Sequence, residues 1–242
     1  MNDFIKFNIN ETINKSLKNL NFKQYTPIQL ESIPLVLKGK DILGSAQTGT
    51  GKTAAFCIPM IELLMRSSKG SALIMIPTRE LAKQVLDVVH SLLGFKSSIN
   101  SVALIGGELI SKQLSQLKKR PRIFVGTPGR INDHLERGTL NLHDTNFLVL
   151  DETDRMLDMG FEVQINRILK FLPSKKQTLM FSATIPNNIK KLSEKYLLNP
   201  KRISVGEENI IAKNIKQEVV KLKSDEKNLE IKNQILKREG SI

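Results

Sequence analysis

The stretch Ala46-Gln47-Thr48-Gly49-Thr50-Gly51-Lys52-Thr53 decides the fold of this chain. It follows a short apolar run at residues 41–45 and precedes an apolar segment of helical period at residues 54–65. Gly49 and Gly51 allow the backbone to turn tightly and to direct several N–H groups at one anion. A helix that begins here adds its unpaired N–H groups and its positive dipole end. The sequence therefore predicts a loop that binds the phosphates of a nucleotide.

Two side chains of this loop have defined tasks at a phosphate site. Lys52 would reach the β- and γ-phosphates, and the Thr53 hydroxyl would ligate Mg²⁺. The general pattern G-x-x-x-x-G-K-[ST] is not met, because Ala46 stands at its first glycine. A glycine-containing turn before a helix is the alternative interpretation. The strand before the loop and the helix after it favour phosphate binding, with all eight residues as candidate nucleotide contacts.

The composition is that of a globular protein with a polyanionic partner. The chain has 242 residues, of which 40% are hydrophobic, enough for one large domain or two small ones. Its net charge is +13, and residues 207–242, with 8 basic and 7 acidic side chains, contribute only +1. The remaining +12 lies in residues 1–206 with the motifs, and it favours nucleic acid over a membrane surface.

Cysteine content and apolar runs indicate the cellular compartment. The single cysteine, Cys57, excludes an internal disulfide and a cysteine metal cluster, and we expect it to be a core residue. No apolar run reaches the length that spans a membrane, and residues 1–6 lack the features of a signal peptide. We therefore expect a soluble cytoplasmic protein.

From residue 41 onward, short apolar runs alternate with helical patterns. This alternation indicates an α/β fold, with a mostly parallel sheet covered by helices on both faces. Ligands on such sheets bind outside the carboxyl ends of the strands. After the first strand at 41–45, we expect strands at 72–76, 102–105, 122–125, 147–150, 177–181 and 202–205. We expect helices at 11–19, 80–93, 111–117, 131–137, 164–171 and 188–197.

An acid pair follows the apolar strand at residues 147–150. Asp151 would hold Mg²⁺ opposite Thr53, and Glu152 would orient and deprotonate the water that attacks the γ-phosphate. A solvated strand end is the alternative for such a pair. The upstream loop favours the nucleotide site, so Lys52, Asp151 and Glu152 are the candidate catalytic residues.

Small hydroxyl residues follow the next strand. Ser182 and Thr184, on either side of Ala183, can hydrogen-bond to acids such as Asp154. A simple turn is the alternative interpretation of this short sequence.

Three further turns follow apolar strands and carry groups suited to phosphate oxygens, namely helix N-termini, glycine amides and arginines. Each alone is an ordinary strand-to-helix turn. Together, at one sheet edge of a basic domain, they indicate a track for a sugar-phosphate backbone. The candidate residues of this track are Pro77, Thr78, Arg79, Gly106, Gly107, Thr127, Pro128, Gly129 and Arg130.

A candidate nucleobase reader precedes residue 30. Thr26 can cap a helix whose first turn holds Pro27. The Gln29 amide offers a donor and an acceptor that suit an adenine edge, with a solvated glutamine as the alternative. The sequence has no Asn-Lys-x-Asp guanine reader, which disfavours a GTPase switch.

In their order, these motifs resemble those of the first RecA-like domain of DEAD-box ATP-dependent RNA helicases, from about residue 4 to residue 205. The sequence at 151–154, DETD, is similar to the motif that names the family, and the family has alanine at the place of Ala46. The resemblance implies ATP and Mg²⁺ as cofactors, RNA as partner, Gln29 as adenine reader and Phe4 as the aromatic that stacks on adenine. It also implies residues that couple hydrolysis to unwinding, namely Asp154, Ser182 and Thr184.

Three positions depart from the family pattern. Asn21 and Tyr25 stand where the adenine motif usually has Gly and Pro. Thr153 stands where the family has Ala, and its hydroxyl lies next to Glu152 in sequence. The functional acids of the motif are intact.

The family has a second RecA-like domain, whose arginines reach the γ-phosphate. Residues 215–220 resemble its first strand, and residues 227–237 read as its first helix. We therefore expect an ATP-binding domain at 1–206, and a linker with a truncated start of the second domain at 207–242. The resemblance implies an ATP-dependent RNA helicase whose isolated chain is inactive in unwinding. The alternative is a non-catalytic ATP- and RNA-binding remnant of a split gene, with the second domain encoded separately.

Overall fold

The computed structural model describes residues 7–94, 97–205, 220–222 and 225–237. The chain divides into two compact units, Met1–Gly206 and Glu207–Ile242. Within the second unit, helix α10 (Lys227–Leu236) has no buried residue, and Leu229, Ile231, Ile235 and Leu236 are exposed. Phe4 and most of the strand expected at 215–220 lie outside the described residues.

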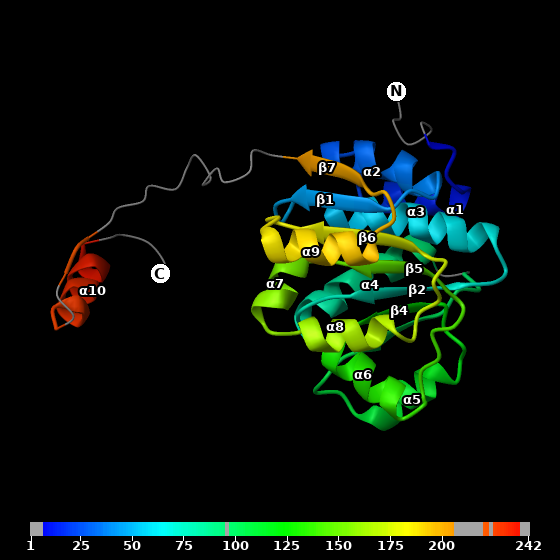
Figure 1. Cartoon of the computed structure of the whole chain (residues 1–242). Helices are drawn as coiled ribbons and strands as arrows, with labels where there is room; N and C mark the ends of the chain where they lie inside the picture. The colour runs from blue at the N-terminus through cyan, green and yellow to red at the C-terminus, as the bar shows by residue number, and fades with distance from the viewer. Residues whose placement is uncertain (1–6, 95–96, 206–219, 223–224, 238–242) are drawn as a thin grey trace. The chain divides into compact units, whose positions relative to one another are not determined.

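A seven-stranded sheet forms the centre of the first unit, with the strand order β3-β4-β2-β5-β6-β1-β7 (Figure 1). All its strand pairs are parallel. The prediction of a parallel α/β sheet is confirmed, and the strand boundaries lie within about two residues of those expected. The strands are β1 (Ile42–Ala46), β2 (Ser71–Met75), β3 (Ser101–Leu104), β4 (Ile123–Gly126), β5 (Thr145–Leu150), β6 (Gln177–Ser182) and β7 (Lys201–Val205).

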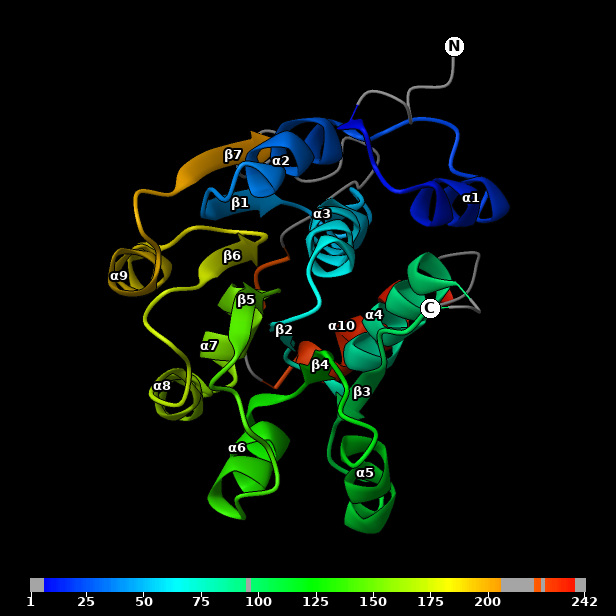
Figure 2. The same cartoon turned by 90° about the vertical axis from the view of Figure 1, so that its right-hand side faces the viewer.

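Helices cover both faces of the sheet (Figure 2). The first core contains residues of α1 (Glu11–Asn19), α2 (Pro27–Leu37), α3 (Lys52–Arg66) and α4 (Arg79–Leu93). The second core contains residues of α6 (Pro128–Glu136), α7 (Thr153–Asp158), α8 (Glu162–Leu169) and α9 (Asn187–Tyr196). Helix α5 (Ile110–Leu117) contacts β3.

Strand β2 shows why these runs are apolar at every position. Ala72 and Ile74 face the first core, whereas Leu73 and Met75 face the second, because successive side chains point to opposite faces. A strand buried on both faces cannot alternate polar with apolar residues. It therefore reads as a continuous apolar run.

Two helices differ from the expected pattern. Helix α6 begins at Pro128, three residues before the apolar period starts, because proline has a suitable φ for the first helical turn. Helix α7 was not expected, because its six residues are too few to show a helical period. Cys57 is fully buried, as expected for a core residue, and burial raises the pKa of its thiol. None of the described helices is both long and apolar enough to cross a membrane.

Asp41 joins three strands at the amino edge of the sheet. Its carboxylate accepts hydrogen bonds from Thr178 N (2.9 Å) and Leu198 N (2.7 Å), and its carbonyl accepts from Lys201 N (2.8 Å). The carboxylate thus positions the starts of β6 and of the segment that leads into β7.

Asp41→Ala is therefore expected to lower the free energy of unfolding by about 3–6 kcal/mol, the combined contribution of one buried and one partly buried hydrogen bond to a carboxylate. Guanidinium unfolding at pH 7 measures this loss. Asp144→Ala, at an exposed aspartate just before β5, is the matched control and should change the unfolding midpoint little. An equal effect of the two substitutions would contradict the role of Asp41.

Candidate active site and RNA interface

The predicted motifs lie at one edge of the sheet, outside the carboxyl ends of the strands. The strand order divides this edge into two neighbouring parts. The loops after β3, β4 and β2 carry the candidate RNA track. The loops after β5, β6 and β1 carry the candidate nucleotide and coupling residues. The boundary lies between the adjacent strands β2 and β5.

The loop between β1 and α3 has the backbone of a phosphate cradle. Gly49 and Gly51 have φ angles of +82° and +89°, which residues with a Cβ atom rarely adopt. Lys52 begins α3, and its ammonium donates to the carbonyl of Ala46 (2.8 Å). The Thr50 hydroxyl donates to the carbonyl of Gln47 (2.7 Å). These bonds hold the loop closed on itself while Gln47, Thr48 and Gly49 stay exposed.

Gln29 connects the adenine motif to this loop. Its Oε1 accepts from Thr26 N (3.0 Å), the N-cap of α2, and its Nε2 donates to the carbonyl of Gly51 (3.0 Å). A Cβ atom on residue 51 would collide with the Gln29 amide, so this position requires glycine. Gln29 is only 1% exposed. One N–H and one lone pair of its amide remain for a base, and adenine reading stays a prediction.

Asp151 and Glu152 line one cavity of about 370 Å³ together with Thr48, Gly49, Gly51, Lys52 and Thr53. Burial raises the pKa of Asp151 to about 6, and the Lys52 ammonium opposes this shift. Glu152 has the left-handed angles φ 50° and ψ 49°, a strained conformation for a residue other than glycine. Its carboxylate lies 3.3 Å from Arg155 Nη1, a contact at i,i+3 helical spacing that our sequence analysis missed.

The opposite wall of this cavity also escaped the sequence analysis. It consists of side chains from the end of β2 and from α4, namely Ile76, Leu81, Gln84, Val85 and Val88. The helical period marks Leu81, Val85 and Val88 as core, and sequence alone does not show that the same helix face also closes a cavity.

The donor set of the cavity fits a Mg–nucleotide. The Thr53 hydroxyl and the Asp151 carboxylate are the hard oxygen ligands that Mg²⁺ takes beside phosphate oxygens. The Thr26 hydroxyl is buried beside Gly51, where it belongs to the capping box at the start of α2 and has no acceptor for its own proton among the described residues. A buried donor without an acceptor is costly, and a ligand can supply that acceptor.

Asp154 connects the acid motif to the turn after β6. Its Oδ2 accepts from Ala183 N (3.1 Å), from Thr184 N (3.0 Å) and from the Thr184 hydroxyl (3.1 Å). Ser182 Oγ accepts from Asp154 N (3.3 Å). The structure thus brings together the three residues that the resemblance assigns to coupling.

Thr153 is directed away from Glu152. Its side chain is fully buried, and its hydroxyl lies 3.2 Å from the carbonyl of Leu150 and 3.1 Å from that of Phe181. The hydroxyl that departs from the family pattern therefore bridges the ends of β5 and β6.

Arg79 lies across Gly106 and Gly107 in the RNA track. A Cβ atom on Gly106 would lie 2.9 Å from Arg79 Nη2, and one on Gly107 would lie still closer to Nη1. Gly107 also has a φ of +79°. Because the two glycines have no Cβ atom, the Arg79 guanidinium group can lie directly against their backbone, and we call this pair of residues the glycine seat.

Arg130 extends the same positive surface. Its Nη1 donates to the carbonyl of Glu108 (3.3 Å), and its Nε lies 3.6 Å from the carboxylate of Asp133. The guanidinium is thus held on the loop that also seats Arg79.

The remaining track residues shape the turns around these arginines. Thr78 is the N-cap of α4, and its hydroxyl accepts from Leu81 N (3.3 Å). Thr127 is the N-cap of α6. A cavity of about 680 Å³ is lined by Pro77, Thr78, Arg79, Glu80, Gly106, Thr127, Gly129, Arg130, Asp133, Met159 and Phe161. Pro128 and Gly107 are adjacent in sequence to lining residues of this cavity. The sequence analysis missed Asp133, Met159 and Phe161, because these residue types carry no phosphate-binding signal.

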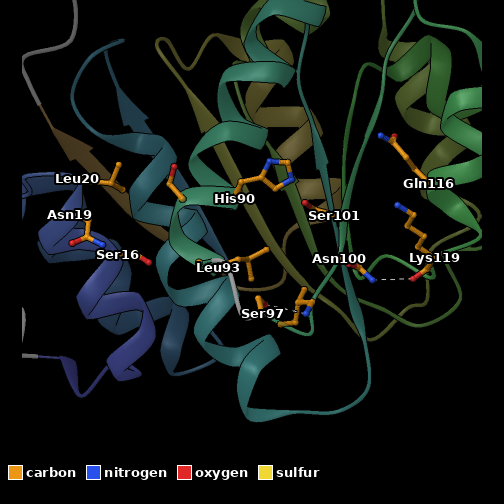
Figure 3. A pocket seen from close by; sticks show the side chains of 13 residues that line it. Ser16, Asn19, Leu20, His90, Leu93, Ser97, Asn100, Ser101, Gln116 and Lys119 are labelled. Atoms are coloured by element: carbon orange, nitrogen blue, oxygen red, sulfur yellow. Dashed lines mark hydrogen bonds between the residues drawn. The ribbon is translucent and has the colours of Figure 1, made fainter.

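A second large cavity, of about 640 Å³, shares no lining residue with the two cavities at the motifs. Figure 3 shows the side chains that line it. It is bordered by the last turns of α1, α4 and α5 and by the start of β3, with Ser16, His90, Ser101 and Gln116 among its lining residues. Its lining residues in the described part of the chain include no carboxylate and no arginine. The described residues that line this cavity therefore offer no carboxylate for Mg²⁺ or for a general base.

The fold and the loops at the strand ends define a P-loop domain of the RecA type. The chain belongs to the DEAD/DEAH box helicase family, whose pattern matches residues 26–192. Two crystal structures share the fold. A DEAD box protein from the hyperthermophile Methanococcus jannaschii has a TM-score of 0.80 and 40% identity, over 98% of this chain and 63% of that one. A hypothetical ATP-dependent RNA helicase from Sulfolobus tokodaii has a TM-score of 0.76 and 34% identity, over 81% and 57%.

Curated relatives carry the same family name. The ATP-dependent RNA helicase CshA of Listeria monocytogenes is 46% identical over 228 residues, which cover 94% of this chain and 44% of that protein. The ATP-dependent RNA helicase DbpA of Bacillus subtilis is 41% identical over 228 residues, 94% and 47% of the two chains. This chain thus spans about half the length of the curated relatives it matches.

Proposed function

We propose that this chain is the ATP-binding half of a DEAD-box RNA helicase, which binds Mg–ATP and RNA and hydrolyses ATP in concert with a second RecA-like domain. One observation carries the proposal. The candidate nucleotide site and the RNA track lie on adjacent strands of one sheet edge, and Asp154 connects the nucleotide side to the turn after β6. The two parts meet at the adjacent strands β2 and β5, so a change of structure in one part can affect the other.

In this proposal each polar residue of the cavity has one role in ATP binding or hydrolysis. Lys52 exchanges its bond to the Ala46 carbonyl for the β- and γ-phosphates. Thr53 and Asp151 would hold Mg²⁺, which when bound would neutralise charge on the phosphate oxygens. Glu152 takes a proton from the attacking water, and its ion pair with Arg155 keeps the carboxylate in place.

The second unit fits the start of a further domain. Its helix α10 exposes four large apolar side chains, as expected of a helix that packs against additional chain. We propose residues 1–206 as the ATP-binding domain and residues 207–242 as the linker and start of the second domain. A separately encoded second domain and a cytoplasmic location are part of the same proposal.

RNA binding should depend on Arg79 and on its glycine seat. Arg79→Ala is expected to weaken the binding of single-stranded RNA by about tenfold for every sequence, because the contact is to phosphate. Gly107→Ala should produce a similar loss, because the new Cβ atom displaces the guanidinium. The double variant should lose little more than either single variant, since both changes remove one interaction. Fluorescence anisotropy at two salt concentrations measures the affinities.

Gly39→Ala is the matched control for the glycine variant. Gly39 has a similar φ of +72°, and nothing lies within 4 Å of its Cβ position. The control should bind RNA as the parent chain does. Additive losses in the double variant, or a strong preference for one base sequence, would contradict the assigned track.

A further inference from the structure

The loop at residues 106–109 supports both arginines of the RNA track. Gly106 and Gly107 seat the Arg79 guanidinium, and the carbonyl of Glu108 accepts from Arg130. The position of this one loop therefore sets the spacing between the two positive groups. The contacts that fix residues 106–109 therefore determine whether Arg79 and Arg130 can bind successive phosphates.

The buried side-chain amide of Gln113 fixes the start of the 106–109 loop through a hydrogen bond. Gln113, on α5, is 0% exposed, and its Nε2 donates to the carbonyl of Ile105 (2.9 Å), the residue directly before Gly106. Its Oε1 lies 3.1 Å from Nε2 of His134, which is also 0% exposed. Because Oε1 only accepts, the His134 ring must donate from Nε2.

His134 links this amide to the other side of the track. It lies on α6, the helix whose first turns carry Pro128, Gly129 and Arg130. Its Nδ1 lies 2.8 Å from the Thr139 hydroxyl, which also lies 3.1 Å from the His134 carbonyl and can donate its single proton to either acceptor. Burial and the neighbouring Arg130 charge lower the pKa of His134, in keeping with a neutral ring that donates at one nitrogen and accepts at the other.

We propose that Gln113 and His134 are positioning residues of the RNA track, which fix the 106–109 loop of one motif to the helix of another. Neither side chain reaches solvent, so neither can contact RNA itself. They act through Arg79 and Arg130. This inference rests on the proposed RNA-binding function, and it adds residues that the strand-end motifs do not include.

Gln113→Met tests the proposal in the full 242-residue chain. Methionine keeps the length of the side chain and removes both hydrogen bonds. We expect binding of a fluorescein-labelled oligouridine to weaken about tenfold, and binding of a fluorescent ATP analogue to change less than about twofold. Gln116→Met, the same substitution one turn away on α5, is the matched control and should leave both affinities unchanged.

A background without the two arginines separates positioning from a general loss of structure. In Arg79→Ala/Arg130→Ala, Gln113→Met should weaken the residual RNA binding by less than about twofold, because the groups it positions are gone. An equal loss in both backgrounds, or no loss in the parent chain, would overturn the proposal. If Arg79→Ala weakens RNA binding by the parent chain but Gln113→Met does not, only the positioning role of Gln113 and His134 is rejected. A parent that binds no RNA would reject the proposed function itself.

Thr139→Val keeps the proposal testable if Gln113→Met does not fold. Thr139 is exposed, and valine removes the contacts of its hydroxyl with Nδ1 (2.8 Å) and with the carbonyl (3.1 Å) of His134, while Gln113 stays in place. RNA affinity should fall by about twofold to threefold with an unchanged melting temperature. Unchanged RNA affinity in this variant would count against the role of His134.

Discussion

ATP hydrolysis by the 242-residue chain alone is expected to be about 10³–10⁵-fold slower than hydrolysis by the same chain with a complementary second domain. The cavity at the ends of β1 and β5 supplies Lys52, Thr53, Asp151 and Glu152 as one wall of the site. By family resemblance, the arginines that stabilise charge on the transferring phosphoryl group come from the second domain. A factor of this size corresponds to about 4–7 kcal/mol of activation free energy.

A steady-state ATPase assay, with and without RNA, measures this difference. The chain is assayed alone and mixed with a separately expressed second domain of a related DEAD-box helicase. Rescue by the added domain would support a divided enzyme, and failure of rescue would favour a non-catalytic ATP- and RNA-binding remnant. Rapid RNA-stimulated turnover by the chain alone would contradict the account and would require an arginine from self-association.

Glu152→Gln is expected to reduce hydrolysis in the rescued, two-domain form by about 10²–10⁴-fold, the usual contribution of a general base. The amide has nearly the same shape but cannot accept the proton of the attacking water. Affinity for the ATP analogue should stay within about threefold, because Glu152 acts on water and not on the phosphates. Single-turnover kinetics and nucleotide titration separate the two quantities.

Glu162→Gln is the control for this substitution. Glu162 is exposed in the first turn of α8 and lies outside both cavities. Its turnover should match that of the parent. Retained hydrolysis in Glu152→Gln would move the general base to another residue and reject the assigned mechanism.

The sheet and the loops at its strand ends were predictable because both depend on local sequence. A strand segment buried on both faces must be apolar, as residues 72–76 and 147–150 are, and its end is marked by a residue that breaks the apolar run, Pro77 in the first case and Asp151 in the second. Gly49 and Gly51 were identifiable because positive φ angles leave few alternatives to glycine. These features required no knowledge of tertiary contacts.

Contacts between distant segments were not predictable in the same way. Nothing in the local sequence shows that Gly106 and Gly107 seat the Arg79 side chain, or that Thr153 bonds to the carbonyl of Phe181. The hydrogen bonds from His134 through Gln113 to Ile105 could not be predicted either, because glutamine is usually exposed and the sequence gives no sign that Gln113 is buried. Such contacts depend on the packing of helices against the sheet, which periodicity does not specify.

The most direct test of the account is the affinity of the chain for a fluorescent ATP analogue, measured with and without Mg²⁺ for the parent and for Lys52→Ala. The account predicts saturable binding that prefers ATP to GTP, weakens without Mg²⁺, and falls by about tenfold or more in Lys52→Ala through loss of a charged phosphate contact. Lys38→Ala, at an exposed lysine after α2, should bind as the parent does. Equal affinity of the parent and Lys52→Ala for the analogue would contradict the assignment of the loop at residues 46–53 as the phosphate site.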